Sequence, residues 1–508
     1  MEDLQVTGGA AAPAKSLRAI SLWSAGVALV AFVLYLALAP SGVGDGDAAE
    51  FTLVLAVGGV PHPPGYPLYA LGRHAWVTLL RALGVGWARA ASAWSALGGA
   101  VAVGLLVALG MRLPSFPASV GTAARAASAL AAAALLALHP AWLREVTVAE
   151  VNSWHVALLA ALCLAALAML RALARGADSA ALGRGALVWG LLCGAAISHR
   201  MTAAFFAVPL GVTIFASLPR EARGRAGLWP RFVIGLLAPF AAYAFVAWRA
   251  AHPARHQWPL LEPSLAGLLS YMRAEVFTFY MGGFAPRSDQ HALLANAIWP
   301  VLVPGMGLLI WSLFRAGEPS VRAFAGALFA AAALQLAFAL RYGVPDPIAY
   351  FVPALIVVAI AAAERLSLLV RHAPGAAALA PAAAAVALLA FVWLPPALEH
   401  RRRLQDVERA IRARWEAIPF ERGIVLWTGD DFVRLRAWQI LEGSKPDVYV
   451  ESPAMLTWDP PRRAFRRRFG FDPLAGIELE TDADLPLIGA NIARHTSLPL
   501  IDFERWRP

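Results

Sequence analysis

Charged side chains are scarce in this 508-residue sequence. They make up 15% of its residues, against 59% that are hydrophobic, and a soluble globule of this length would need far more polar surface. Apolar runs long enough to cross ~30 Å of hydrocarbon as helices recur from residue 19 to residue 395 and then stop. The composition therefore excludes a soluble fold and predicts an all-α polytopic membrane protein.

Cysteine and lysine are also nearly absent. Cys163 and Cys193 are the two cysteines, and both fall inside apolar runs, where buried packing is a far commoner role than metal binding or redox chemistry. No disulfide framework is expected. Lysine occurs only at Lys15 and Lys445, and an arginine-rich, alanine-rich composition of this kind is typical of GC-rich bacteria.

The net charge of +10 lies in the membrane part of the chain. The last 110 residues contain 18 basic and 18 acidic residues, which cancel. The basic excess among the apolar runs therefore indicates orientation in a membrane rather than nucleic-acid binding.

Eleven membrane spans are predicted. The first begins near Ile20 and is followed by no convincing cleavage site, so we interpret it as an uncleaved span. With a cytoplasmic N-terminus, the inner connections hold fifteen basic residues and the outer ones about nine, in agreement with the positive-inside rule. The C-terminal domain is then periplasmic, on the outer face of a bacterial inner membrane. The spans are 19–39, 89–111, 121–139, 153–173, 184–199, 202–218, 229–250, 293–314, 321–340, 348–363 and 375–395.

Polar and ionisable side chains gather on the outer face in this topology, whereas the inner connections hold mostly arginines. Ionisable residues beside apolar spans are functional candidates by default. One outward-facing site built from several loops is therefore predicted. Its candidate residues are Asp45, Asp47, Glu50, His62, Tyr66, Glu145, Glu150, Asn152, His199, Arg200, Arg341, Tyr342, Asp346 and Tyr350.

The segment after the first span is the most informative part of the sequence. The run HPPGYP, residues 62–67, contains three prolines and cannot continue a helix, so it predicts a rigid turn. The apolar patterns on either side of it fit short helices lying at the membrane interface. Asp47 and Glu50 stand three apart and share one face of the first of these helices, where Asp47 fits the N-cap position. The structural alternative is that Asp47 only caps the helix and Glu50 only faces solvent.

An acidic pair followed by this turn resembles the GT-C membrane glycosyltransferases, which take a sugar from a polyprenyl-phosphate carrier on the outer face. The resemblance is to a bacterial family related to the animal plexin-type protein O-mannosyltransferase, through Asp47-x-x-Glu50 and the run His62–Pro67. The family often has Ser-Gly between the two acids, where this chain has Ala48-Ala49. Four further stretches are similar: VTVAEVNSWHVALLAAL, GAAISHRMTAAFFAVP, YGVPDPIAYFVPAL and VLWTGDDFVRLRAWQILEGSKPDVYV.

This resemblance implies a chemistry for the candidate residues. A single displacement at the anomeric carbon needs a base, for which Asp47 is the candidate, with Glu50 orienting the acceptor or sharing a proton with Asp47. His62 would either donate to a phosphate oxygen or tie down the loop.

The leaving phosphate needs positive charge, for which Arg200 is the first choice and Arg144 and Arg341 are the reserves. The alternative for Arg200 is a snorkelling side chain.

The remaining candidates have plain structural alternatives. Glu150 and Asn152 could be interfacial caps, and Asp346 could simply begin the tenth span. The outer loop 251–292 is either a lid or carrier-tail groove, or an interfacial helix. No four-ligand metal cluster is visible, so the lipid-linked sugar is the one ligand implied, although the acids could hold a divalent ion.

Residues 1–398 are expected to form the GT-C-like transmembrane domain, with outer loops 40–88 and 251–292, and residues 399–508 a small α/β domain. In the latter, RGIVLWTGDD predicts a buried strand and turn, FVRLRAWQILEG a helix ended by Gly443, and PDVYVES a second strand. The run TGDD lacks the glycines of a phosphate-binding loop, so no nucleotide site is predicted.

The hypothesis is a glycosyltransferase that moves a sugar, with mannose as a candidate, from a polyprenyl-phosphate carrier to a hydroxyl of a protein or other envelope acceptor. Its partners would be that donor, a protein or glycan acceptor and membrane lipids. Two alternatives stay open: a transporter or flippase for lipid-linked sugars, and a non-catalytic envelope assembly factor.

Overall fold

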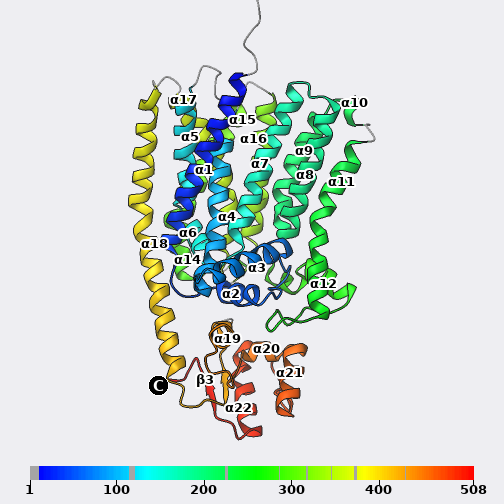
Figure 1. Ribbon diagram of the computed structural model, residues 1–508, viewed down its shortest axis with the longest axis vertical. Coiled ribbons are helices and arrows are strands. Elements are labelled where there is room, and N and C mark those ends of the chain that lie inside the picture. The colour runs from blue at the N-terminus through cyan, green and yellow to red at the C-terminus, as the bar shows by residue number, and fades with distance from the viewer. Residues whose placement is uncertain are drawn as a thin grey trace, which may run out of the picture.

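In the computed structural model a helical bundle forms one end of the molecule and a small α/β domain the other (Figure 1). The structure describes residues 11–113, 121–223, 227–284, 286–315, 319–344, 346–370, 375–429 and 431–507. Arg225 and Arg371, counted among the inner basic residues, and Asp430 of the predicted turn lie outside the described residues.

Nine helices in the described ranges are long and apolar enough to cross a membrane, which confirms the polytopic prediction. The other two predicted spans are also helical. One is α5 (Thr122–Ala137), bent by 71° from α6 (Pro140–Thr147), and the other is the shorter α9 (Ala204–Ser217). The nine helices are α1 (Ala11–Leu38), α4 (Trp87–Gly110), α7 (Asn152–Ala174), α8 (Ser179–His199), α11 with α12 (Leu228–Leu237 and Tyr243–Ala251), α14 with α15 (Ser288–Leu293 and Trp299–Arg315), α16 (Pro319–Ala339), α17 (Val352–Val370) and α18 (Leu379–Glu416).

Burial divides these helices into a centre and a periphery. Most of the apolar length of α4 and α17 is buried inside the protein, whereas α1 and α18 bury only 17% and 11% of theirs. The exposed apolar side chains of a peripheral helix suit contact with lipid rather than water. Figure 1 shows α18 running along one side of the bundle and onward to the tail domain.

Glycines allow α8 and α11 to pack closely. A Cβ atom added at Gly190 would lie 2.2 Å from the Phe232 carbonyl oxygen, and one added at Gly194 would lie 2.2 Å from the Leu236 carbonyl oxygen. Small residues at such contacts let helix backbones approach in a membrane, where no hydrophobic force drives the helices together.

Two short helices lie across the end of the bundle that faces the tail domain (Figure 1). They are α2 (Ala48–Ala56) and α3 (Pro67–Ala82), on either side of the proline-rich turn. The first described turn of α1 lies at the opposite end of the bundle. The candidate loops and the tail domain therefore share one face.

The tail domain is built on a parallel three-stranded sheet in the order β2-β1-β3. Strands β1 (Ile424–Leu426) and β2 (Tyr449–Glu451) and the helix between them, α19 (Phe432–Glu442), occur where the sequence predicts them. β3 (Leu500–Asp502) was not predicted, because three residues carry too little periodic signal. The other helices are α20 (Pro453–Leu456), α21 (Asp459–Phe469) and α22 (Pro486–His495).

The last span does not end before the tail. α18 continues through Pro395 and Pro396 to Glu416, so the expected boundary at residues 398 and 399 falls inside one helix. The outer loop contains α13 (Leu265–Met272) and a short 3₁₀ helix, Glu275–Tyr280.

We expect Gly190→Ala to push α8 away from α11, because its methyl group would overlap a backbone oxygen that cannot rotate aside. Overpacking of this kind costs about 1–3 kcal/mol and should lower the midpoint of thermal unfolding in detergent. The control is Gly185→Ala in the same helix, where the nearest atom is the Met169 methyl carbon at 3.4 Å. Equal midpoints for the two variants would contradict the prediction.

Candidate functional site

The loop before α2 leaves the Asp47 carboxylate uncapped and half-exposed. Asp47 occupies the N-cap position of α2, as predicted, but its side chain makes no capping hydrogen bond, and 48% of that side chain is exposed. Gly44 and Gly46 precede it with φ of 98° and 60°, a conformation that favours glycine. The carboxylate therefore lies at the start of the helix without being used as its cap.

Glu50 and His62 form a buried pair beside Asp47. Both oxygens of Glu50 accept hydrogen bonds from His62, one from the backbone N–H at 2.6 Å and one from ring Nδ1 at 2.7 Å. Glu50 is 6% and His62 is 8% exposed, so the alternative of Glu50 as a solvated surface residue is wrong. The other ring nitrogen, Nε2, lies 3.9 Å from the Asp47 carboxylate.

The proline-rich turn is held by the outer loop 251–292. The Tyr271 hydroxyl donates to the Pro61 carbonyl, and the rings of Trp258 and Phe277 each lie 5.8 Å from the His62 ring. The turn ends at Tyr66, whose φ of 41° is left-handed. The outer loop therefore packs on the acidic segment, and sequence reasoning missed its aromatic residues because no pattern linked them to His62.

A second group of polar side chains surrounds Arg200 at the end of α8. Its guanidinium donates to the Asn152 side-chain oxygen and lies 4.3 Å from the centre of the Tyr350 ring. Asn152 in turn donates to Glu145 at 2.6 Å, and the Tyr342 ring contacts Tyr350 at 4.9 Å. Five candidates from four separate segments thus lie together.

Tyr66 connects the two groups. Its hydroxyl is 3.3 Å from His62 Nε2, and its ring contacts His199 at 5.6 Å. Burial raises the pKa of Tyr66, the nearby Arg200 lowers it, and Asp47 raises it further. Tyr66 is thus close to both the acidic segment and the arginine.

Glu150 is a half-buried acid between α6 and α7, near the same loop. Burial raises its pKa well above 4.5, and the carboxylates of Asp47 and Glu145 raise it further. Its neighbour Arg73 was missed as a candidate, although it is fully buried and donates to the Tyr69 hydroxyl at 2.6 Å. The sequence signal that could have identified Arg73 was the presence of an arginine within an apolar helix pattern.

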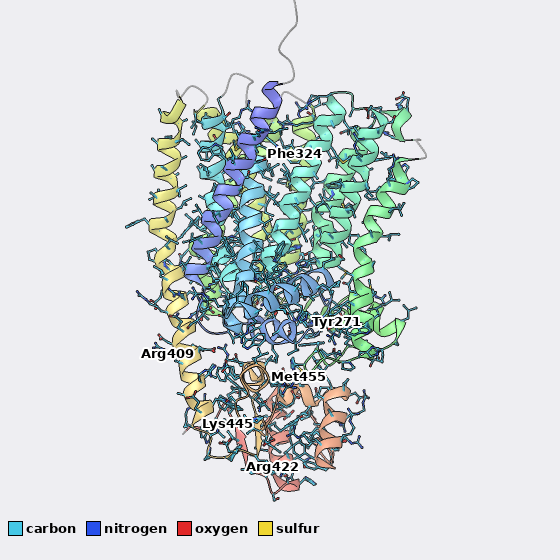
Figure 2. The ribbon with its side chains drawn as sticks, in the orientation of Figure 1. Tyr271, Phe324, Arg409, Arg422, Lys445 and Met455 are labelled. Atoms are coloured by element: carbon cyan, nitrogen blue, oxygen red, sulfur yellow. The ribbon has the colours of Figure 1, made fainter. Side chains whose placement is uncertain are left out.

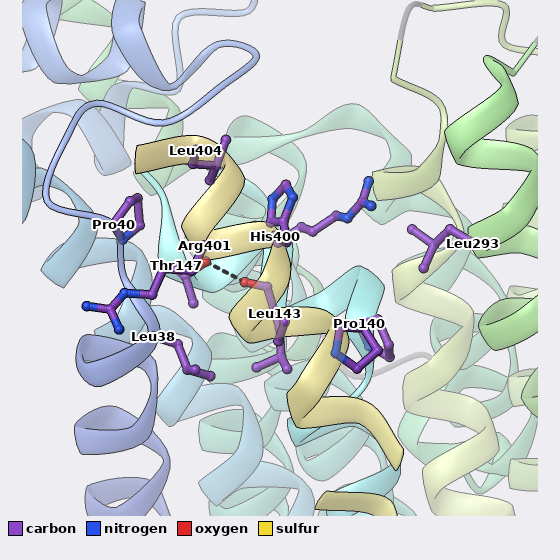
Figure 3. A pocket seen from close by; sticks show the side chains of 12 residues that line it. Leu38, Pro40, Pro140, Leu143, Thr147, Leu293, His400, Arg401 and Leu404 are labelled. Atoms are coloured by element: carbon purple, nitrogen blue, oxygen red, sulfur yellow. Dashed lines mark hydrogen bonds between the residues drawn. The ribbon is translucent and has the colours of Figure 1, made fainter. Parts of the chain in front are cut away.

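The remaining candidates make contacts of other kinds. Arg144 lines a separate cavity of about 70 Å³ together with His400 and Arg401 of α18 (Figure 3), and lies 4.0 Å from Asp289. Asp346 accepts from the Ile348 backbone N–H, which fits the capping alternative. Arg341 is exposed. His199 is tied to the Val151 carbonyl oxygen at 3.1 Å, a structural contact.

An open cavity of about 250 Å³ lies between Asp47 and the tail domain. Asp47 and Glu50 line one side, residues 254–259 of the outer loop line another, and α19 and α20 close it with Phe432, Arg436 and Met455. Figure 2 marks Tyr271 on the bundle side and Met455 on the facing side of the tail. The acids therefore face a space large enough for part of a substrate.

The acidic group also fits a divalent cation. One ligand atom from each of Asp47, Glu50 and His62 lies within 4.8 Å of the others. A carboxylate that holds the far nitrogen of a ligating histidine, as Glu50 holds Nδ1, is common in metal sites. Asp47 and His62 Nε2 would be the ligands, and the ion would supply positive charge to a phosphate.

Comparison with known families agrees with this geometry. Residues 47–222, which include Asp47, Glu50, His62 and Arg200, match the family described as protein O-mannosyl-transferase TMEM260 N-terminal domain. This part of the chain is similar to that family. The predicted resemblance is confirmed, and the TMEM260-type region begins at the acidic residue singled out above. No curated protein sequence matches the chain.

The fold is similar to that of solved GT-C glycosyltransferases. ArnT from Cupriavidus metallidurans, bound to undecaprenyl phosphate, is 14% identical with a TM-score of 0.53, over 81% of this chain and 84% of that chain. An Archaeoglobus fulgidus oligosaccharyltransferase, tethered to an acceptor peptide, has a TM-score of 0.44 and 12% identity, over 85% of this chain and 64% of its own length. The likeness to ArnT shows that the chain has a GT-C-like fold.

We expect Glu150→Gln to change the pH dependence of stability. Because burial raises the Glu150 pKa in the folded state, the native protein holds a proton that the unfolded chain releases, and stability falls as pH rises above about 4.5. Glutamine mimics the neutral acid and removes this loss. The midpoint of thermal unfolding of the variant minus that of the wild type should therefore increase from pH 5 to pH 8, and a constant difference would count against the raised pKa.

Proposed function

We propose that the protein transfers a sugar from a polyprenyl-phosphate carrier to a hydroxyl group of a protein or other envelope acceptor. The observation that carries this proposal is the half-exposed Asp47 carboxylate, which faces a cavity beside a buried histidine–glutamate pair and near Arg200. A base for the acceptor and a cation for the leaving group are the two requirements of the reaction. ArnT bound to undecaprenyl phosphate, a protein of similar fold, supports a polyprenyl carrier.

Asp47 would act as the general base. As the acceptor oxygen forms its bond to the anomeric carbon, its proton passes to the Asp47 carboxylate. The bond between the anomeric carbon and the phosphate oxygen breaks, and its electron pair leaves with the carrier phosphate. A single displacement of this kind inverts the anomeric centre.

Glu50 and His62 would orient this base rather than react. Both Glu50 oxygens already accept hydrogen bonds from His62, so Glu50 is poorly placed to accept the acceptor proton. A neutral His62 that donates from Nδ1 presents an unprotonated Nε2, which accepts from the Tyr66 hydroxyl. This favours the loop-holding role of His62 over donation to a phosphate oxygen.

Arg200 would bind the carrier phosphate. Its guanidinium has five donors, of which one contacts Asn152, and its face rests on Tyr350. The hydroxyls of Tyr342 and Tyr350 would add neutral donors to the same phosphate. We further propose that this face is periplasmic and that the first turn of α1 begins on the cytoplasmic side of a bacterial inner membrane.

We expect Asp47→Asn to reduce sugar transfer by about 10²–10⁴-fold, the range lost when a general base is removed. The assay is transfer of radiolabelled sugar from polyprenyl-phosphate mannose and related donors in proteoliposomes. Asp45→Asn is the matched control, because Asp45 is an exposed acid two residues earlier in the same loop. Full activity in Asp47→Asn would rule out this base, and absence of transfer by the wild type with every donor would favour a flippase.

Arg200→Gln should weaken binding of the donor, because glutamine cannot neutralise a phosphate. The KM for the carrier-linked sugar should rise about tenfold or more, since a hydrogen bond to a charged group contributes about 1.5–3 kcal/mol. Arg341→Gln, at an exposed arginine near the same face, is the control and should leave KM unchanged. Equal effects in the two variants would contradict the assignment of Arg200.

A further inference from the structure

A buried arginine of the tail domain reaches the loop that carries Asp47. Arg434 lies on α19, and its side chain is 3% exposed. Nη1 donates to Glu408 of α18 at 2.5 Å, and Nη2 donates to the Gly44 carbonyl oxygen at 2.5 Å. A second carboxylate, that of Asp431, lies 3.4 Å from Nη2. One guanidinium therefore joins α18, the tail domain and the loop.

The loop has little rigidity of its own. Gly44 and Gly46, both at positive φ, lie within three residues of Asp47, and glycine restricts the backbone less than any other residue. The conformation of the loop must therefore come from its tertiary contacts.

Two further contacts fix the same loop to the tail. Val43 is buried in a cluster with Trp415, Trp427 and Phe432 of the C-terminal region. Gly42 packs so closely on Glu408 that an added Cβ would lie 2.5 Å from the glutamate Cγ. The loop is held on one side by apolar packing and on the other by the Arg434–Glu408 pair.

We propose that Arg434 is a positioning residue for Asp47, which makes the tail domain a required part of the catalytic unit. This inference rests on the proposed function, in which Asp47 is the base. Arg434 touches neither Asp47 nor the cavity; it acts through the Gly44 carbonyl. The same helix lines the cavity with Phe432, Val433 and Arg436, so α19 sets both the position of the base and the opposite wall.

The first test is kinetic. Arg434→Gln should lower kcat about 10- to 100-fold, since small misplacements of a catalytic group have effects of that size, while the KM for the carrier-linked donor changes less than about twofold. Arg434→Lys keeps the charge beside Glu408 but loses the second donor arm, so its kcat should be intermediate. An unchanged kcat in Arg434→Gln would overturn the proposal.

The matched control is Glu442→Gln. Arg412 and Glu442 form a two-pronged ion pair between the same two helices, α18 and α19, without touching the loop. If Arg434 serves only to dock these helices, both variants should lower activity alike, and that result would overturn the positioning role. A fall in kcat confined to the Arg434 variants supports it.

The second test reads the loop directly and does not depend on activity. Both native cysteines are buried, so Val43→Cys adds a thiol whose maleimide labelling reports detachment of the loop. Labelling should be at least about fivefold faster when Arg434→Gln is added to Val43→Cys, because a loop that opens locally exposes its buried side chains to the reagent. Unchanged labelling would overturn the proposal even if Arg434→Gln were too unstable for kinetics.

Asp47→Asn, measured in parallel, separates the two hypotheses. If Asp47→Asn keeps full activity, the proposed function fails. If Asp47→Asn is inactive while Arg434→Gln has a normal kcat and normal labelling, only the positioning role fails.

Discussion

The two hydrogen bonds from His62 to Glu50 are the contact on which the rest of the site depends. They join α2 to the proline-rich turn, two segments that an isolated chain would not hold together. Because both oxygens of Glu50 accept hydrogen bonds from His62, the neighbouring Asp47 is the more accessible acid of the pair. Burial strengthens this arrangement, since a buried carboxylate without partners would be strongly unfavourable.

The site lies where three parts of the chain meet. The bundle supplies Arg200 and its aromatic neighbours, the outer loop covers His62 with Trp258 and Phe277, and the tail domain closes the cavity in front of Asp47. Such a junction is a common place for a substrate site, because side chains from several elements converge there without filling the space between them. The tail domain therefore forms part of the wall of this cavity.

Local sequence patterns were reliable where one segment determines its own structure. Three prolines in HPPGYP forced the turn, and apolar length forced the spans, so both are found where they were expected. They failed where a neighbour decides the outcome. Asp47 takes the N-cap position but its side chain makes no capping hydrogen bond, and α18 runs on through two prolines because its packing continues beyond the membrane part.

The sequence by itself determined a polytopic helical bundle, a small α/β tail and an acidic segment with a stiff turn, since apolar length, proline and strand patterns act locally. Only the tertiary structure decided which acid is accessible, which arginine lies near it and how the tail reaches the loop. These depend on contacts between residues as distant in the chain as Gly44 and Arg434. No periodicity encodes such a contact, because it arises only when separate helices pack and bury their polar groups together.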